Sequence, residues 1–215
     1  MDLLQITRNL GDGMIVSLEI FVLTLLFALP LGLLIAFGRM SKYGIVRALF
    51  KFYISVMRGT PLMLQLLVVY FGPYYLFKIP ISRGYRLVAV VIGFALNYAA
   101  YFAEIYRGGI ESMEVGQYEA AKVLGYSRIQ TFFKIILPQV LKRIIPAMTN
   151  ETITLVKDTS LAFVIAVSEM FTQAKAIAAA ETSMLPFLVA GVFYFVMNLL
   201  IAIIMERLEK KLDYF

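Results

Sequence analysis

Apolar runs long enough to cross a lipid bilayer alternate with short polar stretches along most of this chain. A helix rises about 1.5 Å per residue, so about 20 apolar residues cross a hydrocarbon core of about 30 Å. We therefore predict an all-α polytopic membrane protein with five transmembrane helices, at residues 14–37, 62–77, 87–106, 144–167 and 186–205.

The composition supports a membrane protein and removes several enzyme classes. Apolar residues make up 61% of the 215 residues and charged residues 16%, which lies outside the range of an ordinary soluble domain. The chain has no Cys and no His, which excludes thiol chemistry and argues against zinc sites and histidine catalysis. We expect one transmembrane domain, residues 1–215, with no catalytic residue, no metal site and no cofactor of its own.

The distribution of Lys and Arg predicts the orientation in the membrane. Fourteen of the 20 basic residues lie between the first two spans, in 107–143 and in the C-terminal tail, beside apolar runs, which fits a membrane face and not nucleic acid. We therefore expect the N-terminus outside and the C-terminus and the segment at about 107–142 in the cytoplasm. The first residues lack a signal-peptide pattern, so the first span should insert the chain. The basic residues outside are Arg8, Lys78, Arg83, Arg86 and Lys175.

The stretch at 39–58 mixes basic residues with large apolar side chains. This pattern predicts a helix that lies along the membrane surface with its apolar face toward the lipid. The sequence Arg58-Gly59-Thr60-Pro61 should end that helix, because Gly and Pro both disfavour a helix interior. The next span starts at about Leu62.

The segment at 119–138 is a polar interruption between apolar runs and must lie outside the bilayer. The pattern predicts a helix, a turn and a second helix. Gly125 can take the left-handed conformation that ends a helix, and Ser127 with Gln130 can form a capping box for the next one. We expect Pro138 to stop the second helix.

The surface of this helical hairpin suggests docking. Ala120 and Ala121 carry little bulk, so another backbone could approach them, and the apolar residues at 132–136 could fix the hairpin on its own subunit. The alternatives are a plain connector between two spans, or a helix-turn-helix that reads DNA, which would need a soluble domain.

The hairpin also resembles the signature loop of ABC-importer permeases. Its pattern is E-A-A, three residues, Gly, nine residues and I-x-L-P, and every defined position is matched. The stretches R-G-T-P at 58–61, A-E-x-x-R-G-G-I at 103–110 and K-D-T-S-L at 157–161 are similar to the polar amino-acid branch, the histidine, glutamine and arginine type. The resemblance implies a type I importer-like fold whose coupling helix sits in a groove of a cytoplasmic ATPase. It assigns that coupling to Glu119, Ala120, Ala121 and Gly125.

Partners follow from the span count and from the resemblance. Five spans without an internal repeat cannot build a two-fold transport path, so we expect a second permease subunit, a homodimer in preference to a heterodimer. The resemblance adds a dimer of cytoplasmic ATP-binding subunits, which would hold ATP and Mg, and an extracellular or periplasmic solute-binding protein. It places the complex in a prokaryotic cell membrane. No phosphate-binding G-x-x-x-x-G-K-[ST] motif occurs in this chain.

Charged residues inside the fourth predicted span need a reason to persist, because each costs about 2.5–3.5 kcal/mol at mid-membrane. Glu151, Thr154 and Asp158 share one helical face by their spacing, and Lys157 is adjacent. One interpretation is a structural network in which Lys157 neutralises a carboxylate. The other is a substrate pocket for a cationic amino acid, with two carboxylates for its positive groups and Lys157 for its carboxylate.

Polar residues of the third span are candidates for the same pocket. Asn97 and Tyr101 lie one helical turn apart, and amide and phenol groups suit amino-acid head groups, while a tyrosine ring suits a guanidinium. Tyr98 is a further candidate. Glu104 and Arg107 are spaced for an ion pair at the helix end, and we expect no substrate role for Glu104.

The predicted function is the membrane subunit of an ATP-driven importer for polar, cationic amino acids such as arginine, lysine or histidine, which works by alternating access. The chain itself should not be an enzyme, since ATP hydrolysis belongs to the partner. The alternative is a secondary transporter or ion channel in which Glu151 and Asp158 carry protons or cations.

Overall fold

The computed structural model describes residues 1–82 and 84–212, and every regular element within them is helical. Arg83, which entered the charge count above, lies outside the described residues. The elements are α1 (Leu3–Arg39), α2 (Gly44–Gly59), α3 (Leu62–Phe77), α4 (Tyr85–Glu111), α5 (Val115–Val123), α6 (Arg128–Thr131), the π-helical η1 (Phe132–Ile136), α7 (Leu137–Asp158), the 3-10 helix η2 (Thr159–Ile165), α8 (Met170–Glu181) and α9 (Leu185–Leu212).

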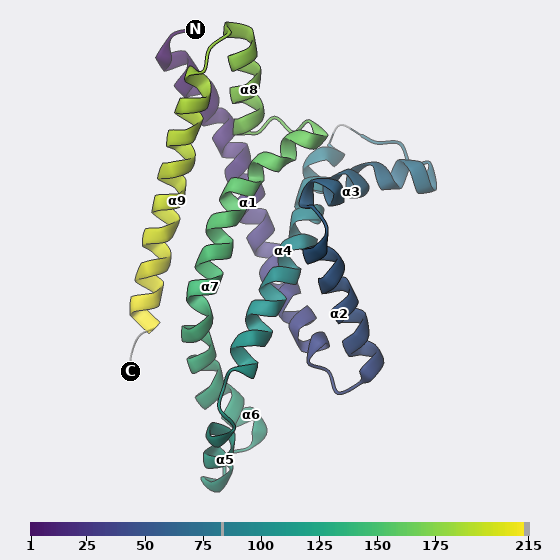
Figure 1. Ribbon diagram of the computed structural model, residues 1–215, viewed down its shortest axis with the longest axis vertical. Helices are drawn as coiled ribbons and strands as arrows, with labels where there is room; N and C mark the ends of the chain where they lie inside the picture. Colours follow the sequence, from purple (N-terminus) through teal and green to yellow (C-terminus); the bar gives the residue numbers. More distant parts are fainter. Residues whose placement is uncertain (83, 213–215) are drawn as a thin grey trace.

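The long helices α1, α4, α7 and α9 extend along the long axis of the molecule (Figure 1). The N-terminus and α8 lie at one end of this axis, and the α5–α6 hairpin projects from the opposite end. Helix α9 starts near the N-terminal end and carries the chain back toward the hairpin end. The N-terminus and the end of α9 therefore lie at different levels along the axis.

Close packing of α1 on α4 forms the centre of the fold. A Cβ atom at Gly32 of α1 would lie 3.0 Å from Cβ of Phe102 and 3.1 Å from the carbonyl oxygen of Ala99. Ala28, Ala99 and Phe102 are completely buried. Small residues let transmembrane helices approach closely, where dispersion contacts replace a hydrophobic driving force.

The number of membrane spans depends on how two bent pairs are counted. Within the described residues, α1, α4 and α9 are each long and apolar enough to cross a membrane. The α2–α3 pair is bent by 109° and the pair formed by residues 128–165 and α8 by 61°, and each passes the same test as one broken span. The five predicted spans match the upper count.

The predicted surface helix, α2, packs against the protein along one side. It lies along α1 and α4 in the fold. The Tyr53 hydroxyl donates a hydrogen bond to the carbonyl of Leu96 at 2.5 Å, and Ile54 is 6% exposed. Most other apolar side chains of α2 are exposed, so its place at the membrane surface stays a prediction. As predicted, α2 ends at Gly59 and α3 begins at Leu62.

The hairpin follows the predicted turn chemistry. Gly125 has a φ of +78°, in the left-handed region. Ser127 caps α6: its hydroxyl accepts from the backbone N–H of Gln130 at 3.2 Å, and the Gln130 side chain accepts from the N–H of Ser127 at 2.9 Å. The predicted turn and capping box are confirmed.

Pro138 does not stop the second helix, which corrects the prediction. The chain continues from α6 through η1 into α7, with Pro138 in the first turn of α7. In the π-helical stretch the N–H of Leu137 donates to the carbonyl of Phe132, five residues back. This wider turn carries the carbonyl groups away from the proline ring, so the helix can continue.

Helix α8 lies in a segment that the sequence analysis treated as a loop. The Glu169 carboxylate caps it, accepting from the N–H groups of Phe171 and Thr172 at 2.7 Å each. A Cβ atom at Gly13 of α1 would lie 2.8 Å from Cα of Met170, so α8 packs closely on α1. The fourth predicted span accordingly ends in η2 and turns back at Ala166, whose φ is +56°.

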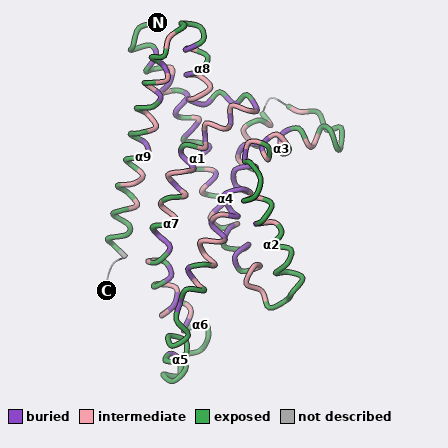
Figure 2. Tube along the Cα trace, in the orientation of Figure 1, coloured by how far each residue is buried: buried purple, intermediate pink, exposed green. Residues whose placement is uncertain are grey.

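Burial is uneven over the molecule (Figure 2). Buried residues concentrate where α1 and α4 meet. In contrast, only 11% of the most apolar stretch of α9 is buried, and the hairpin is mostly exposed. Many large apolar side chains of α1, α3 and α9 are exposed. Such surfaces are expected where a chain faces lipid or a second subunit.

Candidate functional site

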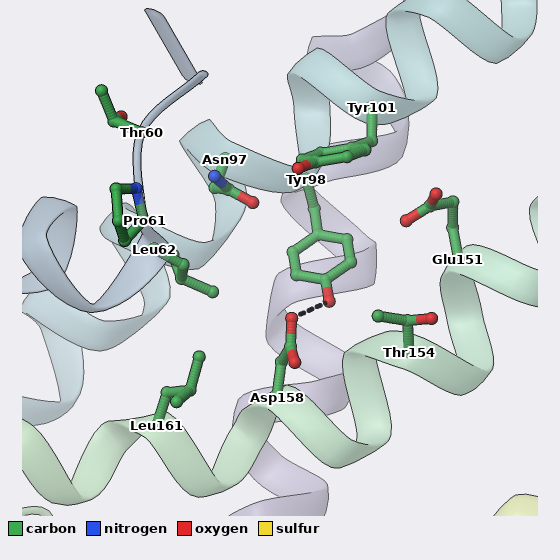
Figure 3. Close-up of a pocket in the computed structure, with 10 residues that line it drawn as sticks. All are labelled: Thr60, Pro61, Leu62, Asn97, Tyr98, Tyr101, Glu151, Thr154, Asp158 and Leu161. Carbon is green, nitrogen blue, oxygen red and sulfur yellow. Dashed lines mark hydrogen bonds between the residues drawn. The ribbon is translucent and has the colours of Figure 1, made fainter. Parts of the chain in front are cut away.

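A cavity of about 360 Å³ lies where the α2–α3 break, α4, α7 and η2 meet (Figure 3). Six of the seven residues predicted to bind substrate line it, and four others complete the lining. The predicted ones are Asn97, Tyr98, Tyr101, Glu151, Thr154 and Asp158, and the others are Thr60, Pro61, Leu62 and Leu161.

The α4 side of the cavity is aromatic. The Tyr98 ring stacks on Phe94 with 6.2 Å between centroids, and Tyr98 is 2% exposed. Its hydroxyl donates a hydrogen bond to Oδ2 of Asp158 at 2.7 Å. This bond joins α4 to the C-terminal end of α7 and fixes the Asp158 carboxylate at the cavity.

Asn97 lines the cavity but its amide already has partners. Nδ2 donates to the carbonyl of Met57 at 3.0 Å and to Oε1 of Gln65 at 2.9 Å. Gln65 in turn donates to the carbonyl of Thr60 at 3.1 Å. Asn97 and Gln65 therefore hold the α2–α3 break in place, and sequence reasoning missed Gln65.

The α7 side of the cavity is acidic. Glu151, Thr154 and Asp158 lie on one face, as their spacing predicts (Figure 3). The Thr154 hydroxyl donates to the carbonyl of Asn150 at 2.9 Å. Among the residues that the structure describes, the half-buried Glu151 makes no side-chain hydrogen bond or ion pair, so its carboxylate is available to a ligand.

Lys157 is separated from this arrangement. It is exposed and is not among the residues that line the cavity. The structure thus brings together the two carboxylates but not the amine that was expected to complete the set. The spacing explains the result, since adjacent residues of a helix point about 100° apart.

The α2–α3 break contributes the lining residues that sequence reasoning missed. Thr60, Pro61 and Leu62 border the cavity on the side away from Glu151 (Figure 3). No side chain caps the N-terminus of α3, and unpaired N–H groups of a first helical turn attract negative charge. The R-G-T-P stretch signalled the break but not its place beside the cavity.

Two charged groups lie near the cavity without lining it. One is the predicted Glu104–Arg107 ion pair, and the other is Arg58, which the sequence analysis did not single out. Glu104 and Arg107 form the predicted ion pair, with contacts of 3.0 and 2.6 Å. Arg58, at the end of α2, lies over the Tyr101 ring with 5.2 Å from its guanidinium carbon to the ring centroid. No sequence signal singled out Arg58 as a neighbour of the cavity.

The residues predicted to couple to the ATPase lie on the α5–α6 hairpin, which projects from one end of the molecule (Figure 1). Glu119 and Ala120 are exposed, whereas Ala121 is 1% exposed and packs on its own subunit. Gly125 forms the turn between α5 and α6. Arg143 ties α7 to the end of α4 by donating to the carbonyl of Ser112 at 2.6 Å, which fixes the base of the hairpin.

A family model described as "Binding-protein-dependent transport system inner membrane component" matches residues 28–214. The chain belongs to this family. It is the inner-membrane permease component of an ABC transporter, multi-pass in the membrane, and the ATPase is a separate subunit. The prediction from the signature loop is confirmed, and the alternatives of a secondary transporter, an ion channel and a DNA-reading domain are set aside.

Relatives of this permease share most of its length. A Bacillus subtilis protein, the arginine transport system permease ArtQ, is 37% identical over 94% of this chain and 91% of its own. A Rickettsia bellii protein named as a glutamine transport system permease, GlnP, is 35% identical over the same shares. A crystal structure titled as an amino acid ABC transporter with histidines has a TM-score of 0.87 at 32% identity, over 98% of this chain and 99% of that one.

These relatives confirm the polar amino-acid branch and the all-helical fold, and they belong to systems that depend on ATPase subunits and a binding protein. Their names differ in the amino acid, with arginine in one and glutamine in another. Among the described residues no group of His, Asp or Glu could hold a metal ion.

Proposed function

We propose that this chain, a permease of an ABC importer for polar amino acids, carries the cationic ones, arginine, lysine or histidine. The observation that carries the proposal is the distribution of charge around the cavity. Glu151 and Asp158 lie on its α7 side, and the uncapped N-terminus of α3 lies on the other. A bound zwitterion would direct its ammonium group to α7 and its carboxylate to the break.

An amino acid with a cationic side chain matches the two negative charges of the cavity. Asp158 accepts a hydrogen bond from Tyr98 at 2.7 Å, and Glu151 makes no hydrogen bond or ion pair within the described residues, so two carboxylates face one ligand. An arginine or lysine brings two positive groups. A neutral amino acid would leave one carboxylate unpaired and an acidic one would add repulsion, and both are disfavoured by unpaired buried charge.

The size of the cavity supports a small ligand. Ligand sites commonly measure about 300–1,000 Å³, and this cavity of about 360 Å³ is at the lower end of that range. Aromatic residues such as Tyr101 can also stack on a guanidinium. In several secondary transporters, broken helices likewise turn half-helix N-termini toward anionic substrate groups.

The rest of the proposed complex follows from the two ends of the molecule. We propose that the hairpin, as part of a coupling segment at about 107–142, docks on the ATPase through Glu119 and Ala120, with Gly125 setting the turn. Exposed apolar residues on the hairpin support a partner surface outside the membrane, as lone apolar patches mark interfaces. They are Val115, Val123, Leu124 and Ile129.

The proposal also covers the orientation of the chain in the membrane and its pairing with a second permease chain. The N-terminus and the hairpin lie at opposite ends, which supports an external N-terminus and a cytoplasmic hairpin and C-terminus. The single domain at 1–215 would pair with a second permease chain, preferably a copy of itself, and receive the amino acid from an external binding protein.

Uptake by proteoliposomes that contain the permease, its ATPase and its binding protein tests this function. Labelled arginine should enter only with ATP, unlabelled lysine should compete, and glutamate should not. Arginine uptake that needs no ATP, or equal competition by glutamate, would contradict the proposal. Glutamine as a third competitor measures how far the cavity tolerates a neutral side chain.

A further inference from the structure

Arg58 is a charged residue beside the cavity that has no assigned role. It lies in the last turn of α2, two residues before Thr60, which lines the cavity. Its guanidinium carbon is 5.2 Å from the centroid of the Tyr101 ring, another lining residue. The guanidinium therefore lies beside the cavity, next to Tyr101, where its charge also interacts with that of Glu151.

The contact that holds Arg58 in this structure is weak. Its Nη1 atom is 3.9 Å from Oε2 of Glu104, and the Arg58 side chain is 45% exposed. Glu104 has a closer partner, Arg107, whose Nη2 atom is 2.6 Å from the same oxygen. Exposed ion pairs are worth about 0–1 kcal/mol, so Arg58 can leave Glu104 at little cost.

The cavity has a use for this cation. Lys157, expected to bind the substrate carboxylate, is exposed and outside the lining. The carboxylates of Glu151 and Asp158 repel an α-carboxylate from the α7 side. The Arg58 guanidinium beside the cavity matches a carboxylate in charge and also in its paired donor geometry, which a lysine amine lacks.

We propose that Arg58 exchanges Glu104 for the α-carboxylate of the bound amino acid and thereby positions the substrate in the cavity. The Tyr101 ring guides the guanidinium between the two partners. With the carboxylate held by Arg58, the α-ammonium faces Glu151 and the side chain extends toward Asp158. This inference rests on the proposed function, because it assumes that an amino acid occupies the cavity.

Binding of two probes to the purified complex of permease and ATPase tests the exchange. Arginine carries the α-carboxylate, and agmatine is arginine without it. Arg58→Gln should weaken arginine binding by about tenfold or more, about 1.4 kcal/mol, while agmatine binds within about twofold of wild type. Arg58→Lys should lie between, since it keeps the charge but not the paired donors.

Two further variants complete the design. Arg47→Gln removes an exposed cation from the same helix and should change neither ligand. Glu104→Gln releases Arg58 and should leave arginine binding as tight as wild type or tighter. Both results distinguish the exchange from a general loss of positive charge.

Other outcomes overturn the inference. Unchanged arginine binding in Arg58→Gln, or equal loss of arginine and agmatine, would assign Arg58 a structural role only. Loss of arginine binding in Glu104→Gln equal to that in Arg58→Gln would show that the pair acts as a fixed unit. A wild-type complex that binds neither arginine nor glutamine would instead reject the proposed function, and this inference with it.

Discussion

The α5–α6 hairpin is held by contacts between residues that are close in the sequence, whereas the cavity is held by contacts between residues that are far apart in the sequence. In the hairpin, Gly125 forms the turn and Ser127 bonds Gln130 three residues on. At the cavity, Tyr98 bonds Asp158, 60 positions away, and Asn97 bonds Gln65, 32 positions away. The hairpin is mostly exposed, and the cavity is lined by helices of its own chain.

From this difference we expect that mutations can change substrate binding and ATPase coupling separately. A change at the cavity should alter which amino acid binds, while the hairpin still engages the ATPase. A change in the hairpin should alter ATP-driven uptake, while direct binding of arginine is retained. Measurement of both quantities on each variant shows whether the two regions are independent.

Glu151→Gln should have the largest effect. The variant removes one of the two carboxylates of the cavity, so arginine binding should weaken by tenfold or more, since loss of one partner of a buried charge pair costs about 2–5 kcal/mol. Discrimination against glutamine should relax. Direct binding of arginine and glutamine to the purified complex, compared side by side, measures both effects.

Glu19→Gln is the matched control for Glu151→Gln, because Glu19 is an exposed carboxylate on α1. It should leave both ligands unchanged. A Glu151→Gln protein that loses arginine and glutamine equally and melts at a lower temperature would favour the structural network. Full arginine transport in both Glu151→Gln and Asp158→Asn would contradict a role of these carboxylates in substrate binding, although the family assignment would stand.

Gly125→Val should impair coupling without impairing binding. The φ of +78° costs an L-residue about 1–2 kcal/mol, and a β-branched side chain resists it further. ATP-driven arginine uptake should fall by up to about tenfold at unchanged arginine affinity. Gly125→Asn, which tolerates the left-handed region, should keep most of the uptake. Equal uptake by the Val variant and wild type would show that this turn is not needed for coupling.

The same contrast explains what the sequence could predict. The capping box and the turn depend on neighbours, so Ser127, Gln130 and Gly125 were identified correctly from the sequence. Helical spacing also grouped Glu151 with Asp158. The role of Gln65 and the place of Arg58 depend on how α2, α3 and α4 meet, and no local pattern contains that information.

The prediction for Pro138 was wrong, and that for α2 stays a prediction. Amphipathic helices on a membrane surface and helices packed on a core share one pattern, so the pattern of α2 does not decide between them. Pro138 was expected to end a helix, but the π-helical turn before it, a feature without a sequence signature, accommodates the ring.

Ala120→Trp should weaken the contact with the ATPase. Ala120 is exposed on α5, so a large side chain should clash with the partner and lower co-purification of the ATPase several-fold, while arginine binding remains. The comparison is Ala121→Trp, whose site is 1% exposed and leaves no room, so that variant should also lower the melting temperature. Normal ATPase recovery with Ala120→Trp would exclude docking through this face.

Ser127→Ala should have the smallest effect, because it loosens the hairpin without changing its surface. The hydroxyl accepts from the N–H of Gln130 at 3.2 Å, and loss of an N-cap costs about 1 kcal/mol, a factor of about five in an equilibrium. ATP-driven uptake should therefore fall by less than about fivefold, with unchanged arginine binding. Ser127→Asn keeps a capping oxygen and should restore uptake. If Ser127→Ala instead abolished uptake as fully as Gly125→Val, the hydroxyl would contact the ATPase directly, and the hairpin would depend on its partner for more than its fold.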